Sequence, residues 1–275
     1  MVTHHGVIEK ELEDINSIEQ CYFNVLNEII STIDNREPIC TFSLDNGYLL
    51  FSTNYQYDQS SVLMNWYQSQ VKDQSLADAM EYYHYPMNSN GFGQLLCIGV
   101  PKIIRQSLQF NIRKLKARLN GIGAGIFSAE VGARQWFHAD ELESYIIWKI
   151  GKKKNDELLS IKNNELLSYF SISRSGKKVK INWQYGQRDN VEMIRQYINT
   201  IANDKTAINA PADKVFIYTC NDKKQDIKTL IELDIANMVP LNPLKILKMA
   251  EEKKISTYDG LSLAETGNGF SGIDV

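Results

Sequence analysis

The stretch SYIIWKIGKKKNDELLSIKNNELLSYFSIS, residues 144–173, decides the fold class of this chain. It alternates three apolar runs with two polar turns, Gly151 to Asp156 and Asn163-Asn164. Short apolar runs bounded by Gly, Asn and Asp are typical of β-strands joined by tight turns. The sequence therefore predicts a three-stranded antiparallel meander, and a fourth extended run follows over 178–185.

Downstream of this meander, helical and strand-like periods alternate. We expect helices over 190–202, 224–233 and 243–252, with strands over 214–219 and 238–241 between them. A meander that feeds such an alternation gives a mixed sheet with helices on its faces. This order resembles that of ribonuclease H-like domains.

The residues before Ser144 repeat the same order without the opening strands. We expect a helix at 17–33, followed by strands at 39–44 and 48–53 that form a hairpin around Asp45-Asn46-Gly47. An inserted segment at 54–92 with a helix at 60–71 comes next. The expected elements after it are a strand at 94–100, a helix at 101–119, a strand at 122–128 and a helix at 129–139. Two such copies in tandem resemble the actin-like fold. The expected class is therefore α/β, an actin-like fold of two ribonuclease H-like lobes with mixed sheets. The lobes would be residues 1–143 and 144–275, and the first would lack its opening strands.

The composition excludes several classes of function. With 43% hydrophobic, 10% aromatic and 23% charged residues, the chain is an ordinary globular protein. A net charge of −3 offers no overall attraction for nucleic acid. The four scattered cysteines form no metal-binding pair, and no secretory signal or run of about 20 apolar residues is present. We expect a cytoplasmic protein that binds neither metal nor nucleic acid and reaches a membrane only through a partner.

Three segments resemble PilM, the actin-like cytoplasmic component of type IV pilus assembly. The first is Leu95–Lys102, which leads into a helix and the strand at 121–127. The second is the meander at 145–173, and the third is Val239–Leu244 followed by Tyr258–Phe270. The resemblance implies a PilM-like adaptor or scaffold, peripheral at the inner membrane. Such a protein would bind the short cytoplasmic tail of an inner-membrane pilus or secretion component in a groove between its lobes.

The chain departs from this family where actin-like ATPases hold their nucleotide. Residues 1–16 contain no strand–turn–strand, so we expect that the chain either starts downstream of the family's first phosphate loop or lacks it. Lys149 stands where the family has an aspartate, and Cys220-Asn221-Asp222 replaces a glycine pair. A protonated lysine can neither ligate magnesium nor act as a base. We therefore expect no catalytic residue and no cofactor.

The alternative to a non-catalytic adaptor is a nucleotide-binding actin-like ATPase or switch. In that case Lys149, Gly151, Lys152 and Asn221 would contact ATP. The other interpretation of these lysines is an exposed, solvated turn.

Two further patterns favour structural roles. Gly121-Ile-Gly123-Ala-Gly125 follows a basic helix and precedes the strand-like Ile126-Phe127, so it predicts close strand–helix packing rather than a dinucleotide loop. Asp156 and Glu157 flank a turn and are expected to be solvated, which disfavours a nuclease.

Aromatic and arginine side chains, which are enriched at interfaces, suggest the walls of the partner groove. The candidates lie in 82–92 and 128–137, and they are Tyr83, Tyr85, Phe92, Arg134 and Trp136. Core packing is the other interpretation for each. The basic helix after Pro101 fits either a solvated outer helix or contact with lipid headgroups or an acidic partner.

Overall fold

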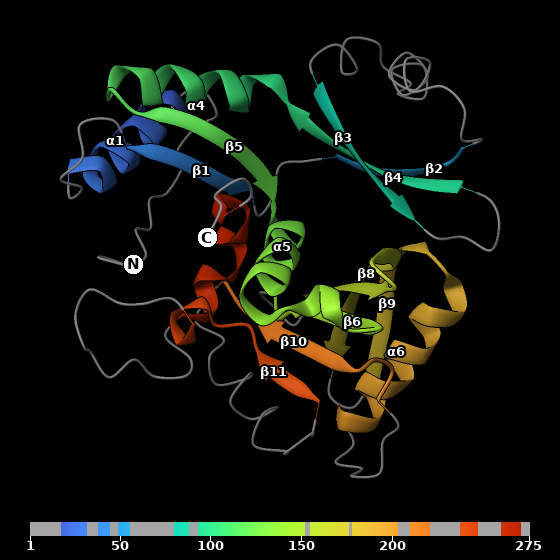
Figure 1. The fold of residues 1–275 in the computed structure, drawn as a ribbon. Helices are drawn as coiled ribbons and strands as arrows, with labels where there is room; N and C mark the ends of the chain where they lie inside the picture. The colour runs from blue at the N-terminus through green and yellow to red at the C-terminus, as the bar shows by residue number, and fades with distance from the viewer. Residues whose placement is uncertain are drawn as a thin grey trace.

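The computed structural model describes residues 18–31, 38–44, 49–55, 80–87, 93–151, 155–175, 178–202, 210–220, 237–246 and 260–270. These residues form a mixed α/β structure with one two-stranded and one nine-stranded sheet (Figure 1). The predicted helices at 60–71 and 224–233 lie outside the described residues.

The second half of the chain contains the predicted meander. Strands β6 (Ser144–Lys149), β7 (Asn155–Lys162), β8 (Glu165–Ser175) and β9 (Lys178–Gly186) pair antiparallel in chain order. Helix α6 (Arg188–Ala202) then leads to β10 (Lys214–Tyr218), which lies parallel to β6 and to β11 (Met238–Pro240). The predicted meander with its fourth strand, the helix at 190–202 and the strands at 214–219 and 238–241 are confirmed.

This sheet is buried because its strands are apolar on both faces. Tyr145, Trp148 and Phe216 are each at most 1% exposed. Burying a large apolar side chain stabilises a fold by roughly 1.5–3 kcal/mol. On one face, α6 presents Val191, Ile194, Tyr197, Ile198 and Ile201 as its buried residues. Their spacing of three and four residues places them along one side of the helix.

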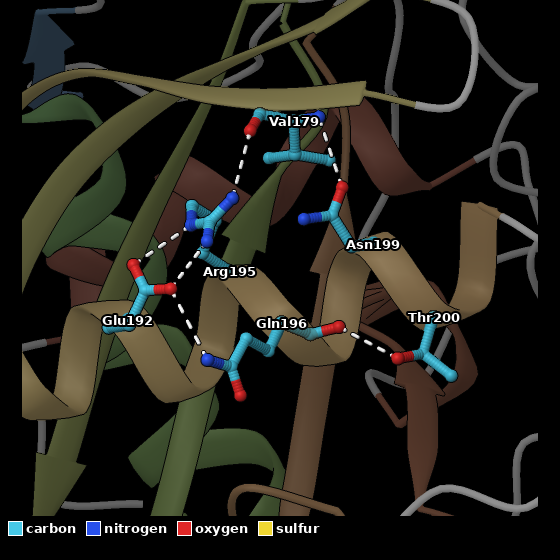
Figure 2. A network of polar contacts seen from close by, with 6 residues as sticks. All are labelled: Val179, Glu192, Arg195, Gln196, Asn199 and Thr200. Atoms are coloured by element: carbon cyan, nitrogen blue, oxygen red, sulfur yellow. Dashed lines mark hydrogen bonds and ion pairs between the residues drawn. The ribbon is translucent and has the colours of Figure 1, made fainter.

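Side chains of α6 contact the backbone of β9 at Val179 (Figure 2). The Val179 N–H donates to Asn199 Oδ1 at 3.1 Å, and Arg195 Nη1 donates to the Val179 carbonyl at 3.5 Å. Arg195 is itself held by Glu192. These contacts satisfy backbone groups that an edge strand otherwise leaves open.

The first half contains α1 (Ile18–Ser31), β1 (Ile39–Leu44), β2 (Leu49–Tyr55), β3 (Met80–Met87), β4 (Gly93–Pro101), α4 (Lys102–Lys114), β5 (Arg118–Ala124) and α5 (Gly125–Phe137). Strand β1 pairs parallel with β5. Strand β4 pairs antiparallel with both β2 and β3, and β3 meets β8 at Met87 and Leu166.

The predicted hairpin between β1 and β2 is therefore wrong. The two strands belong to different sheets, since β1 takes β5 as its partner and β2 takes β4. The residues Asp45-Asn46-Gly47 favour a turn locally, but they do not determine which strands pair. The apolar run in β4 offers β2 a longer partner, and strand pairing depends on such tertiary contacts.

The predicted ends of α4 and β5 also need correction. The helix ends at Lys114, because Lys116 takes a positive φ of 55° and turns the chain into β5. Helix α5 then begins at Gly125 rather than Ala129. The glycines at 121 and 123 thus lie in a strand, and the third glycine opens a helix. The prediction that Ile126 and Phe127 continue a strand is wrong.

Three short 3₁₀ segments complete the described structure: η2 (Ala139–Glu141), η4 (Pro243–Lys245) and η5 (Leu261–Phe270). Only the first turn of the helix predicted at 243–252 is described; Asn242 caps it by accepting the Leu244 N–H at 3.0 Å. Segment η5 crosses α5 at backbone contact, because a Cβ on Gly267 would lie 2.2 Å from the Gly132 nitrogen. This crossing brings η5 beside β1 and α5 (Figure 1).

Candidate functional site

A buried polar cluster lies where β6, β10 and η5 meet. Lys149 Nζ donates to Glu265 Oε1 at 2.6 Å, and the Tyr218 hydroxyl donates to the same oxygen at 2.8 Å. The Lys149 residue is 4% exposed and Tyr218 is fully buried. We call these three residues the Lys149–Glu265 cluster.

The strand register explains how the cluster forms. Strands β6 and β10 run parallel with Lys149 opposite Tyr218, so both side chains emerge at the carboxyl ends of neighbouring strands. The crossing with α5 places Glu265 over them. A Cβ on Gly125, the first residue of α5, would lie 3.5 Å from both Lys149 Nζ and Glu265 Oε1. The start of α5 therefore packs directly against the ion pair.

The charges of Lys149 and Glu265 form a buried ion pair. Burial raises the pKa of Tyr218 well above its usual value, and the Glu265 charge raises it further. Two buried opposite charges are tolerated because each compensates the other. Because the Glu265 carboxylate is paired with the Lys149 ammonium, Glu265 is disfavoured as a metal ligand or a general base.

A second buried carboxylate, Asp156, contacts residues at the end of β6 and on β8. It accepts hydrogen bonds from Trp148 Nε1 at 3.0 Å and the Gly151 N–H at 3.2 Å, and it pairs with Arg174 Nε at 2.6 Å. Burial raises the pKa of Asp156, and Arg174 opposes that rise. The prediction that Asp156 is solvated is wrong, because alternation along β7 turns it inward. Its contacts give it a structural role.

A groove of about 260 Å³ opens beside the cluster. Its lining residues are Thr41, Phe42, Ser43, Cys220, Ser262, Glu265 and Thr266. Successive strand residues point to opposite faces, so a groove lined by Thr41, Phe42 and Ser43 in a row follows the edge of β1. Among the described strands β1 pairs only with β5. We call this feature the β1–η5 groove.

The predicted nucleotide contacts are partly described. Lys149 lies in the buried cluster, so a solvated position for it is wrong. Gly151 donates its N–H to Asp156, and its backbone packs against the Asn155 carbonyl. Lys152 and Asn221 lie outside the described residues. Within the described ranges no group of three or more His, Cys, Asp or Glu side chains could hold a metal ion.

Of the predicted groove-wall residues, neither Arg134 nor Trp136 lines the β1–η5 groove. Arg134 is exposed and pairs with Glu130 at 2.8 Å, while Trp136 is buried on the same helix. Tyr83 and Tyr85 lie in β3 without described side chains, and Phe92 lies outside the described residues. Their contact with a partner stays a prediction.

Sequence reasoning missed Glu265 and Tyr218. A signal for Glu265 was present, because it is the only acidic residue in the apolar, small-residue segment 261–270. Lys149 likewise stands alone in an apolar strand. A lone charge in an apolar segment is buried only with a partner, so the two residues could have been matched.

No family model and no curated protein matches this chain. Among solved structures it is similar to the PilM–PilN type IV pilus biogenesis complex, at 11% identity and a TM-score of 0.59, covering 98% of this chain and 88% of that chain. It is also similar to the cytoplasmic domain of EpsL, an inner membrane component of the type II secretion system of Vibrio cholerae, at 10% identity and a TM-score of 0.42, covering 92% and 82%. A protein of unknown function with an actin-like ATPase fold from Bacteroides thetaiotaomicron matches at 10% identity and a TM-score of 0.41, covering 85% and 80%.

The likeness to the PilM structure defines the fold. The chain has a mixed α/β architecture with an actin-like fold, and this fold is similar to that in the PilM–PilN structure. The predicted fold class is confirmed, whereas the division at residue 143 stays a prediction. None of the described helices combines the length and the apolar character needed to cross a bilayer.

Proposed function

We propose that this protein is a non-hydrolysing, PilM-like scaffold that binds an extended peptide from an inner-membrane pilus or secretion component. The observation that carries the proposal is the Lys149–Glu265 cluster, which lies beside an open groove at the strand ends. The proposal also places the protein on the cytoplasmic side of the inner membrane, with residues 1–143 and 144–275 as its two lobes.

The cluster supports the absence of hydrolysis. A nucleotide phosphate that recruited the Lys149 ammonium would leave the Glu265 carboxylate buried without its counter-charge. Removing one partner of a buried ion pair costs about 3–5 kcal/mol. Phosphate binding would have to offset that cost before it gained any affinity.

The groove supports peptide binding. An extended chain can lie along a strand edge, where main-chain hydrogen bonds give affinity and side-chain pockets give selectivity. Residues Thr41, Phe42 and Ser43 of β1 line the groove, so a peptide lying in it would follow this strand. The structure of a PilM–PilN complex shows that a protein of this fold assembles with a second pilus protein.

The peptide claim can be tested with short overlapping peptides from the cytoplasmic tails of single-span membrane proteins encoded beside this one. Binding would be followed by fluorescence anisotropy. Thr266→Trp places a bulky ring at the groove mouth and should abolish binding. Ser175→Trp adds the same ring at the exposed end of β8 and should leave binding unchanged. Equal binding by the two variants would contradict the proposal.

A further inference from the structure

Exposed apolar side chains concentrate at one end of the molecule. The described residues include six large apolar side chains that are exposed, and four of them lie in α1, β1 and α4: Ile29, Ile39, Ile103 and Phe110. On α4 the residue Ile103 is 65% exposed and Phe110 is 50% exposed. These two residues stand seven positions apart, so they share one face of the helix. Single exposed apolar residues are ordinary, but such a grouping indicates a contact surface.

The same region is strongly basic although the whole chain is acidic. Residues 102–118 contain six basic residues and no acidic one: Lys102, Arg105, Arg113, Lys114, Lys116 and Arg118. The last four are exposed. Because the chain carries a net charge of −3, this segment is a local reversal of charge.

The basic and apolar groups lie on the same outer face. Lys114 Nζ is 4.1 Å from the centroid of the Phe110 ring and 5.8 Å from that of Phe23 on α1. The opposite face of α4 supplies the core, where Leu108 and Ile112 pack with Leu26. Ile103 and Phe110 are therefore not needed for the packing of the helix. In Figure 1, α4 runs along the outer border of the molecule.

We propose that this outer face of α4 binds directly to the surface of an anionic phospholipid membrane. Ile103 and Phe110 enter the headgroup region, and the basic residues from Arg113 to Arg118 contact lipid phosphates. Aromatic and aliphatic side chains beside lysine and arginine are the chemistry of interfacial helices. The adjoining helix α1 contains two acidic residues in its sequence, Glu19 and Glu28, against the six basic residues of 102–118.

This inference is independent of the peptide groove. It differs from the expectation that the protein reaches a membrane only through a partner, because the proposed contact with lipid is direct. An acidic protein surface could match the charge of α4, but lipid also accounts for the two apolar side chains exposed on the same helix.

The test is co-sedimentation of the full chain with phosphatidylcholine vesicles that contain or lack phosphatidylglycerol. Binding should require phosphatidylglycerol and weaken with added salt. Arg113→Gln combined with Lys114→Gln should reduce the partition constant by about thirty-fold, since each basic residue near an anionic surface contributes roughly five-fold. Phe110→Ser should also reduce it.

Matched controls keep the test specific. Lys178→Gln combined with Lys180→Gln removes two exposed charges from β9, and Met193→Ser removes an exposed apolar side chain from α6. Both controls should bind like the unmodified protein. Failure of that protein to sediment with phosphatidylglycerol vesicles would overturn the proposal, as would equal losses in the α4 and control variants. Capture of an acidic protein without any vesicle binding would overturn the assignment to lipid.

Discussion

At the scale of single residues, Lys149 and Glu265 neutralise each other in a place that solvent scarcely reaches. Such a pair adds little net stability compared with an apolar pair of the same size, because both charges must be desolvated. Its importance lies in mutual dependence, since neither charge is tolerated there alone. Tyr218 shares the dependence, because its hydroxyl donates to the same carboxylate oxygen.

Lys149→Met should therefore destabilise the protein by about 3–5 kcal/mol, because Glu265 remains buried without a counter-charge. Urea denaturation would measure the free energy of unfolding. The double variant with Glu265→Leu should recover most of the loss. Lys162→Met breaks an exposed pair with Glu143 and should cost about 1 kcal/mol or less. A loss of similar size for Lys149→Met would contradict the assignment.

The buried tyrosines predict a specific response to alkali. Burial raises the pKa of Tyr197 to about 12, and it raises the pKa of Tyr145 and Tyr218 as well. Because the folded pKa lies above the unfolded value, the protonated phenols stabilise the fold fully below about pH 10. That contribution is lost as the pH rises towards 12.

Ultraviolet absorbance of tyrosinate, followed against pH, measures this effect. These three phenols should stay protonated above pH 10 until the protein unfolds, whereas all tyrosines should titrate near pH 10 in urea. Native protein that ionises every tyrosine near pH 10 would show that the core is open to water.

At the scale of elements, β9 illustrates how the fold manages an open strand edge. Asn199 and Arg195 of α6 bind the Val179 N–H and carbonyl as a neighbouring strand would (Figure 2). The exposed Lys178 and Lys180 add charge to the same strand. Charge on an edge strand and side-chain contacts to its backbone both oppose pairing with another chain.

Asn199→Ala should cost about 1–3 kcal/mol, because the Val179 N–H loses its acceptor in a buried position. Thr200→Ala is the matched control on the same helix, since its hydroxyl only donates to the Gln196 carbonyl at the surface. Thermal unfolding followed by circular dichroism distinguishes them. Equal melting temperatures for the two variants would show that the edge contact contributes nothing.

The sequence predicted best those elements whose partners are near in the chain. The meander β6–β9 follows from its apolar runs and turn residues, because each strand pairs with the next one. The pairing of β1 with β5 could not be inferred in this way, since the two strands are far apart in sequence. The boundary at Gly125 was missed because Ile126 and Phe127 are good strand formers that tertiary packing holds in a helix.

At the scale of the whole molecule, the candidate site depends on the crossing of α5 and η5. The sequence singles out Lys149 because the PilM family has an aspartate at that position. Its partner Glu265 lies 116 positions away and could not be identified in the same way. The contact between Gly132 and Gly267 that brings Glu265 over β6 leaves no periodic signal in the sequence. The sequence alone shows that the segment after Pro101 is basic and contains apolar residues. Which of these side chains are exposed follows only from the packing of α4 on α1.

We expect the Lys149–Glu265 ion pair to occupy, at the strand ends, the place that a nucleotide would take. Thermal unfolding in the presence and absence of millimolar Mg-ATP tests this most directly, since a ligand that binds only the folded state raises the melting temperature. We expect no shift and no release of phosphate. A concentration-dependent rise in melting temperature that Lys149→Met abolishes would contradict the account and favour a nucleotide-dependent switch.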